Sequence, residues 1–158
     1  MTAAAFQSMT RLRERKLQDE RTGHEMSRSE QSRGQVLRFS RVWFSIAGWW
    51  GILSLTPLFF CYNLVGSKNP PPITHPEYYF GFLSVALAWQ IAFLIIARDP
   101  VRYRMMMLPA TIEKFGYALT CFALAARHMA AGTTAVFGGL DLLLGIGFFV
   151  AWRATKST

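Results

Sequence analysis

Two charged side chains in apolar sequence are the residues of this chain best placed to do chemistry. Asp141 lies in an apolar run from Ala135 to Trp152, and Arg127 ends the apolar run before it. An ionised side chain at membrane depth is costly, so it usually faces protein or water and usually has a partner. We therefore predict an ion pair between Arg127 and Asp141 on two neighbouring antiparallel helices.

The estimated depths of the two charges support this pairing. A helical rise of about 1.5 Å per residue places Arg127 roughly 8 Å and Asp141 about 10 Å beneath the outer boundary of the hydrocarbon. Gly138 and Gly145 lie on the same helical face as Asp141. Small residues let membrane helices approach closely, so these glycines are the expected packing residues.

Other polar residues extend the candidate site. Glu113, Tyr117 and Arg127 share one stripe of the predicted third helix, and a polar stripe should face the interior of a bundle. Together with Gln90 they would continue the site toward the cytoplasm. Two interpretations stay open: the charged pair fixes helix register, or the group forms a proton or ligand site.

The composition indicates a membrane protein. Of the 158 residues, 52% are apolar and 15% aromatic, which leaves too little polar surface to cover a soluble domain. Since a crossing needs about 20 residues, we predict an all-α bundle of four transmembrane helices. Its spans lie near residues 42–65, 79–97, 109–128 and 134–152. Pro57 should kink the first span, and the third is short enough that an interfacial or re-entrant segment is the alternative.

Basic residues predict the topology. Arg98, Arg102 and Arg104 lie between the second and third spans, and further basic residues precede the first span and follow the last. The positive-inside rule then places both termini in the cytoplasm. The three arginines could also contact lipid headgroups. The net charge of +8 is thereby explained as topology, and nucleic-acid binding is not expected.

The N-terminal part differs from the rest in composition. Residues 1–37 are rich in charged and polar residues and poor in large apolar ones. Such a segment buries too little surface to offset chain entropy, so we predict a mostly disordered, basic cytoplasmic tail. The transmembrane domain then comprises residues 38–158.

No pattern for a metal or cofactor is present. Cys61 and Cys121 form no C-x-x-C motif and are predicted at different depths, which favours buried free thiols. His75 and Glu77, in a proline-rich outer loop, lack a second histidine at ligand spacing, so a rigid spacer is favoured over a metal site. We predict no cofactor, no metal and no catalytic residue.

The order of motifs resembles a known group. An aromatic first span is followed by GFLSVALAWQ, a basic turn RDPVRYR, EKFGY, and a last helix with GGLDLLLG. Over residues 39–153 this arrangement is similar to the small four-helix bacterial membrane proteins broadly related to the DoxX-like group. The resemblance implies the four-helix architecture. It also permits a link to quinone-dependent sulfur oxidation or redox homeostasis, with which some relatives are associated.

The predicted function is a non-catalytic accessory or structural protein of the inner membrane. Its partners would be the lipid bilayer and either another membrane protein or a second copy of the chain. One alternative is a small permease or proton-coupled carrier that uses Glu113, Arg127 and Asp141. A second alternative is a quinone-linked redox subunit, which predicts an apolar groove lined by Trp89, Tyr117 or Phe148.

Overall fold

The described part of the chain is helical. The computed structural model describes residues 3–68, 73–130 and 132–155, and in these ranges it contains α-helices and short 3-10 helices but no strand. The chain divides into two compact units, Met1–Gln35 and Val36–Thr158, which are described separately. The all-helical class predicted from the sequence is confirmed for these residues.

The first unit belongs to helix α1 (Ala3–Leu55), which continues into the second unit. The prediction of a mostly disordered tail over residues 1–37 is not confirmed, because the described residues from Ala3 onward are helical. This stretch has no proline, and its Glu, Gln, Lys and Arg residues are good helix formers. Its charges of both signs also allow favourable pairs one helical turn apart.

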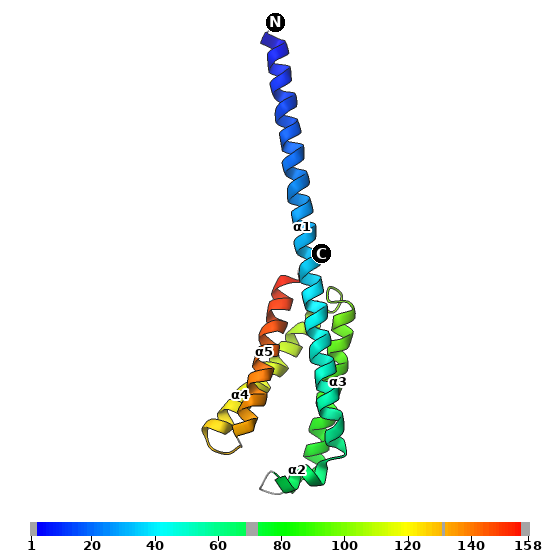
Figure 1. Ribbon diagram of the computed structural model, residues 1–158, viewed down its shortest axis with the longest axis vertical. Helices are drawn as coiled ribbons and strands as arrows, with labels where there is room; N and C mark the ends of the chain where they lie inside the picture. The colour runs from blue at the N-terminus through cyan, green and yellow to red at the C-terminus, as the bar shows by residue number, and fades with distance from the viewer. Residues whose placement is uncertain (1–2, 69–72, 131, 156–158) are drawn as a thin grey trace. The chain divides into compact units, whose positions relative to one another are not determined.

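The second unit contains the rest of α1 and the helices that follow it (Figure 1). The predicted spans near 79–97, 109–128 and 134–152 correspond closely to three of these helices. In chain order the elements are η1 (Thr56–Phe59), α2 (Tyr62–Lys68), α3 (Pro76–Arg98), η2 (Arg104–Met106), α4 (Met107–Ala126) and α5 (Gly132–Ala154).

The predicted first span, 42–65, is divided. We expected Pro57 to kink a continuous helix, but α1 ends at Leu55 and Pro57 lies in the first turn of the 3-10 helix η1. A proline lacks the backbone N–H that would continue the ladder, and its ring clashes with the carbonyl one turn earlier. Phe60 N–H then donates to Pro57 O at 3.0 Å, which tightens the turn before α2.

Three stretches are long and apolar enough to cross a membrane. Among the described residues these are Gln18–Phe59, Pro76–Arg98 and Gly132–Ala154. The helix α4 is not among them, and its apolar sequence is interrupted by Glu113 and Lys114. The architecture is therefore that of a membrane protein with three helices that satisfy length and composition for crossing.

Helices α4 and α5 form an antiparallel pair with close backbone approach (Figure 1). A Cβ atom on Gly138 would lie 2.8 Å from Cys121 Cβ and 3.3 Å from Ala118 O. One on Gly145 would lie 3.1 Å from Lys114 Cβ. The glycines allow this contact because any side chain there would separate the helices.

Two adjacent glycines offer a matched test of this contact. Gly138→Ala should lower the thermal midpoint of the protein in detergent by several degrees, because overpacking costs about 1–3 kcal/mol. Gly139→Ala should leave the midpoint unchanged or raise it slightly, since no atom lies within 4 Å of a Cβ at this position. Equal midpoints for the two variants would contradict the packing described.

The aromatic core lies toward one end of the second unit. Phe44, Phe93 and Phe148, from α1, α3 and α5, are fully buried. The rings of Phe44 and Phe148 stack with centroids 4.0 Å apart, and Phe93 packs edge-on against Phe148 at 4.9 Å. Such aromatic pairs add to the stability gained by burial alone. Three helices are thus joined by one ring cluster.

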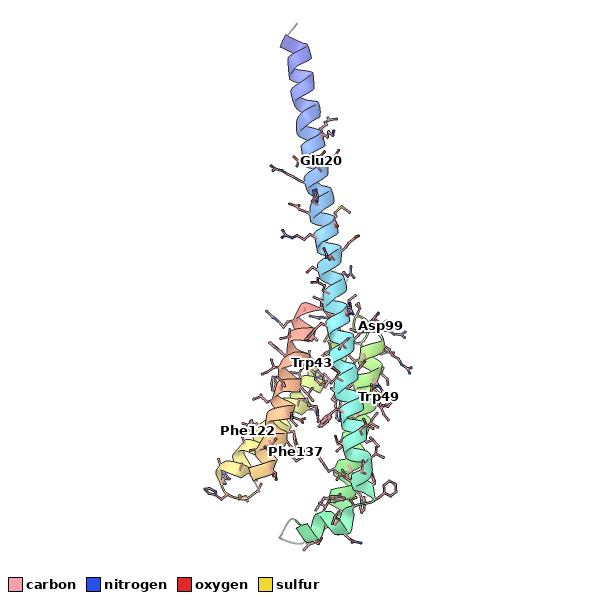
Figure 2. The ribbon with its side chains drawn as sticks, in the orientation of Figure 1. Glu20, Trp43, Trp49, Asp99, Phe122 and Phe137 are labelled. Carbon is pink, nitrogen blue, oxygen red and sulfur yellow. The ribbon has the colours of Figure 1, made fainter. Side chains whose placement is uncertain are left out.

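Polar contacts reinforce the same end. The hydroxyls of Ser40 and Thr155 lie 3.3 Å apart, and Arg104 Nε donates to Thr155 O. Trp43 lies between α1 and α5 (Figure 2), and its Nε1 donates to Leu144 O at 3.2 Å. We call this end, defined by Ser40, the phenylalanine cluster and Thr155, the closed end of the second unit.

Candidate functional site

The partner of Asp141 is Lys114. The ammonium of Lys114 donates to both carboxylate oxygens, with Nζ 3.3 Å from Oδ1 and 3.1 Å from Oδ2 of Asp141. The Lys114 side chain is 7% exposed and that of Asp141 is 18% exposed. The predicted ion pair between Arg127 and Asp141 is therefore wrong in its cation. Asp141 does pair with a basic residue of the preceding helix, but that residue is Lys114.

Arg127 lies outside the site for a geometric reason. It caps α4, and His128 adopts a left-handed backbone with φ of 54°. Met129 N–H then donates to Leu124 O at 2.9 Å, and His128 N–H donates to Ala125 O at 3.0 Å. These two bonds form the Schellman motif that ends many helices, and they leave the Arg127 side chain exposed.

The short turn after α4 also corrects the depth estimate. Arg127 and Gly132 bracket the turn, so they lie at similar levels. Asp141 lies more than two turns further along α5, about 13 Å deeper. Lys114 lies more than three turns from the end of α4, about 18 Å deep by the same rise, and its long side chain spans the remaining difference in level to reach Asp141.

The sequence contained a signal for Lys114. Ala110, Lys114, Ala118 and Cys121 recur at steps of three and four, and all four are buried in the structure. Small residues at helical spacing mark a close helix contact, and a lysine among them must face the partner helix. The prediction instead followed the polar stripe through Glu113, whose side chain is only partly buried.

A second carboxylate completes the charged group. Glu113 Oε2 lies 3.4 Å from Lys114 Nζ but forms no hydrogen bond with the described residues, although the atom is buried. Lys114 thus lies between two acids, with its hydrogen bonds directed to Asp141. With all three ionised, this charged group carries one excess negative charge. We call Glu113, Lys114 and Asp141 the charged cluster.

The charged cluster borders a cavity of about 490 Å³ between the helices of the second unit. This volume lies in the range of small-molecule sites. The cavity is mainly apolar, and its charged residues lie on α4 and α5. Besides the charged cluster, its lining includes Trp50, Ser54, Phe82, Gln90, Tyr117 and Phe137.

The structure therefore brings most predicted site residues together. Gln90, Glu113, Tyr117 and Asp141 all line the cavity, whereas Arg127 does not. Gln90 is 3% exposed, and its Nε2 donates to Ala86 O at 3.0 Å. Its carboxamide oxygen lies against Gly51, where a Cβ atom would collide with it. Gly51 thus makes room on α1 for the Gln90 side chain.

The cavity ends against the aromatic core. Lys114 Nζ lies 5.4 Å from the centroid of the Phe93 ring, a cation–π distance. Phe93 belongs to the buried cluster with Phe44 and Phe148, so the charged cluster rests directly above the closed end. At the opposite end, Phe137 on α5 (Figure 2) and Phe82 on α3 are more than half exposed. We call the end with Phe82 and Phe137 the mouth of the cavity and the end with the charged cluster its floor.

The aromatic residues named for a quinone groove do not meet in one place. Phe148 lies in the core, Trp89 packs against that core, and Tyr117 lines the cavity beside Phe82, with ring centroids 6.1 Å apart. Of the three residues named as alternatives for that groove, Tyr117 therefore lines the cavity, whereas Trp89 and Phe148 belong to the core and its packing.

The arginines of the α3–α4 turn lie at the closed end. Arg98 and Arg102 are exposed, and the Arg102 backbone N–H donates to Asp99 Oδ1 at 3.1 Å. Arg104 is held instead, because it donates to Thr155 O and its guanidinium carbon lies 5.2 Å from the Trp152 ring centroid. Two of the three predicted headgroup-contacting arginines are thus free to meet a phosphate.

The remaining candidates lie apart from the cavity. His75 Nδ1 and Glu77 Oε1 are 3.0 Å apart at the exposed start of α3. Cys61 and Cys121 are free thiols. Among the described residues, no group of three His, Cys, Asp or Glu side chains is arranged to hold a metal ion.

Comparisons with protein-family models, with curated proteins and with solved structures found no match for this chain.

Proposed function

We propose that this chain is an integral protein of the bacterial inner membrane that binds a small amphipathic molecule in the cavity above its charged cluster. It would act as a non-catalytic accessory protein or carrier, alone or with a second membrane subunit. The observation that carries the proposal is the cavity of about 490 Å³ with a buried charged cluster at its floor. A purely structural ion pair would be expected in a filled helix interface rather than beside open space.

The proposed topology has four crossings, with α1, α3, α4 and α5 spanning and both termini in the cytoplasm. Exposed arginines gather at the closed end, which the positive-inside rule places on the cytoplasmic side. They are Arg38, Arg41, Arg98, Arg102 and Arg153. The mouth of the cavity then faces the periplasmic half of the membrane.

The ion pair supports the crossing of α4. Lys114 and Asp141 neutralise each other across the α4–α5 contact, which removes most of the cost of placing either charge at membrane depth. The close approach at Gly138 and Gly145 keeps α4 against α5 over much of its length. The likeness of the motif order to DoxX-like proteins also favours four helices.

A non-catalytic role is supported by the chemistry of the lining. Ser54 and Tyr117 carry the hydroxyl groups of the cavity, and neither forms a hydrogen bond to a base in the part of the chain that the structure describes. Nucleophilic catalysis requires such a pair. Binding without covalent chemistry is the simpler use of the site.

Two adjacent residues of α1 test the proposed cavity and its orientation. Ser54 lines the cavity, whereas Leu53 does not and is 69% exposed. In a background with Cys61 and Cys121 replaced by serine, Ser54→Cys should react in intact cells with a membrane-impermeant cationic thiol reagent. Leu53→Cys should not react, because its side chain would face lipid.

The same pair provides the control and the contrary result. Both cysteines should react equally after denaturation, which shows that each variant is present. Labelling of Leu53→Cys but not Ser54→Cys would contradict a water-accessible cavity. Labelling of Ser54→Cys only in inverted vesicles would reverse the proposed orientation.

A further inference from the structure

We infer that the cavity selects a lipophilic organic cation, such as a quaternary onium ion or a protonated amine with aromatic substituents. The inference rests on the proposed function and names the ligand class for the same site. It follows from the net charge of the cluster, from a buried carboxylate oxygen that accepts no hydrogen bond from the described residues, and from the aromatic side chains of the lining.

The net charge of the cavity lining favours a cation. Glu113, Lys114 and Asp141 together carry one excess negative charge when ionised, and α1 and α3 contribute no titratable residue to the described lining. No cation other than Lys114 therefore offsets the second acid. A bound anion would add to the excess, whereas a bound cation would cancel it. In a low-dielectric site this difference is large.

The hydrogen bonds of the charged cluster also favour a cation. Lys114 and Asp141 satisfy each other, but the buried Glu113 Oε2 accepts no hydrogen bond within the described ranges. Gln90 lines the same cavity and uses its Nε2 within α3. A buried acceptor without a hydrogen bond is costly. A positively charged ligand would compensate the Glu113 oxygen electrostatically.

The aromatic side chains of the cavity lining favour a cation as well. Four aromatic side chains border the same cavity as the charged cluster, one each from α1, α3, α4 and α5: Trp50, Phe82, Tyr117 and Phe137. Aromatic faces attract cations through the ring quadrupole, most strongly for tryptophan and for ligands removed from water. The rest of the lining is apolar, which suits the hydrocarbon substituents of such an ion.

A pair of ions matched in shape tests the inference. Tetraphenylphosphonium and tetraphenylborate have similar size and hydrophobicity but opposite charge. Equilibrium dialysis against the full chain in neutral detergent, with protein-free micelles subtracted, should show saturable binding of tetraphenylphosphonium. Tetraphenylborate should bind at least about tenfold more weakly, as expected for a site whose charge contributes more than about 1.4 kcal/mol.

Variants connect the selectivity to the cluster. Glu113→Gln makes the charged cluster neutral and should weaken tetraphenylphosphonium binding about tenfold, without weakening tetraphenylborate binding. Glu113→Asp keeps the charge and should retain the preference. Glu77→Gln is the matched control, because Glu77 is an exposed acid at the start of α3 outside the cavity.

The outcomes separate this inference from the proposed function. Equal binding of the two ions, or tighter binding of tetraphenylborate, would overturn cation selectivity but leave a small-molecule site. Saturable binding of neither ion, together with no labelling of Ser54→Cys, would overturn both. If Glu113→Gln does not fold, the comparison of the two ions on the unaltered chain still decides the result.

Discussion

Replacing Lys114 by methionine is expected to lower the free energy of unfolding by about 3–5 kcal/mol. The change leaves Asp141, which is 18% exposed, and Glu113 without their cation. An uncompensated buried carboxylate loses its attraction but not the cost of its desolvation. Denaturation of the purified protein by mixed detergent micelles, followed by circular dichroism, measures the loss.

Two further variants identify the pair responsible. Lys114→Met combined with Asp141→Leu should recover at least half of the lost stability, since Glu113, the more exposed of the two acids, is then the one carboxylate of the charged cluster without its cation. Arg127→Met should unfold at the same detergent fraction as the unaltered protein, because the Arg127 side chain is exposed at the end of α4. A loss for Arg127→Met equal to that for Lys114→Met would contradict the observed pairing.

Replacing Phe148 by alanine is expected to lower the free energy of unfolding by about 3 kcal/mol. Phe148 is fully buried and contacts the rings of both Phe44 and Phe93, so its removal opens a cavity between three helices. In a membrane, lost packing contributes more to this cost than lost hydrophobic transfer, which places the expected value at the lower end of the range. The same detergent titration measures it.

The next residue along α5 is the control. Phe149 is 45% exposed, and its only ring contact within the described residues is with Trp152. Phe149→Ala should therefore cost less than about 1 kcal/mol, the usual scale for substitutions outside a packed core. Similar losses for Phe148→Ala and Phe149→Ala would show that the ring cluster does not hold the closed end together.

Composition and periodicity were sufficient to predict the long helices α3 and α5 but not the end of α1. The predicted ranges 79–97 and 134–152 lie within α3 and α5, because long apolar runs bounded by polar residues define such helices directly. The range 42–65 failed at Pro57. The sequence shows where a proline lies but not whether neighbouring helices supply a partner for the carbonyl that it frees.

The candidate site was predicted in outline but not in its pairing. Asp141 and Glu113 were found because acids in apolar sequence are rare. The partner of Asp141 was missed because depth was counted from an assumed hydrocarbon boundary rather than from the turn that joins α4 to α5. Counting from Gly132 would have excluded Arg127 and indicated Lys114. Gln90 and Tyr117 face the same cavity because of how α3 and α4 are rotated about their own axes. These rotations depend on helix packing, which a single sequence does not specify.

The ion pair between α4 and α5 has a consequence for biogenesis. The α4 segment carries both Glu113 and Lys114 and, unlike α5, is not among the helices apolar enough to cross a membrane, so the translocon should release it poorly into lipid on its own. If α4 and α5 entered the lipid together as a hairpin, with Lys114 already paired with Asp141, the cost of inserting the charged α4 would be removed. In a background without Cys61 and Cys121, a chain that ends before Gly132 should therefore leave Arg127→Cys open to a membrane-impermeant thiol reagent from the cytoplasmic side, and only a chain that includes α5 should place it on the periplasmic side.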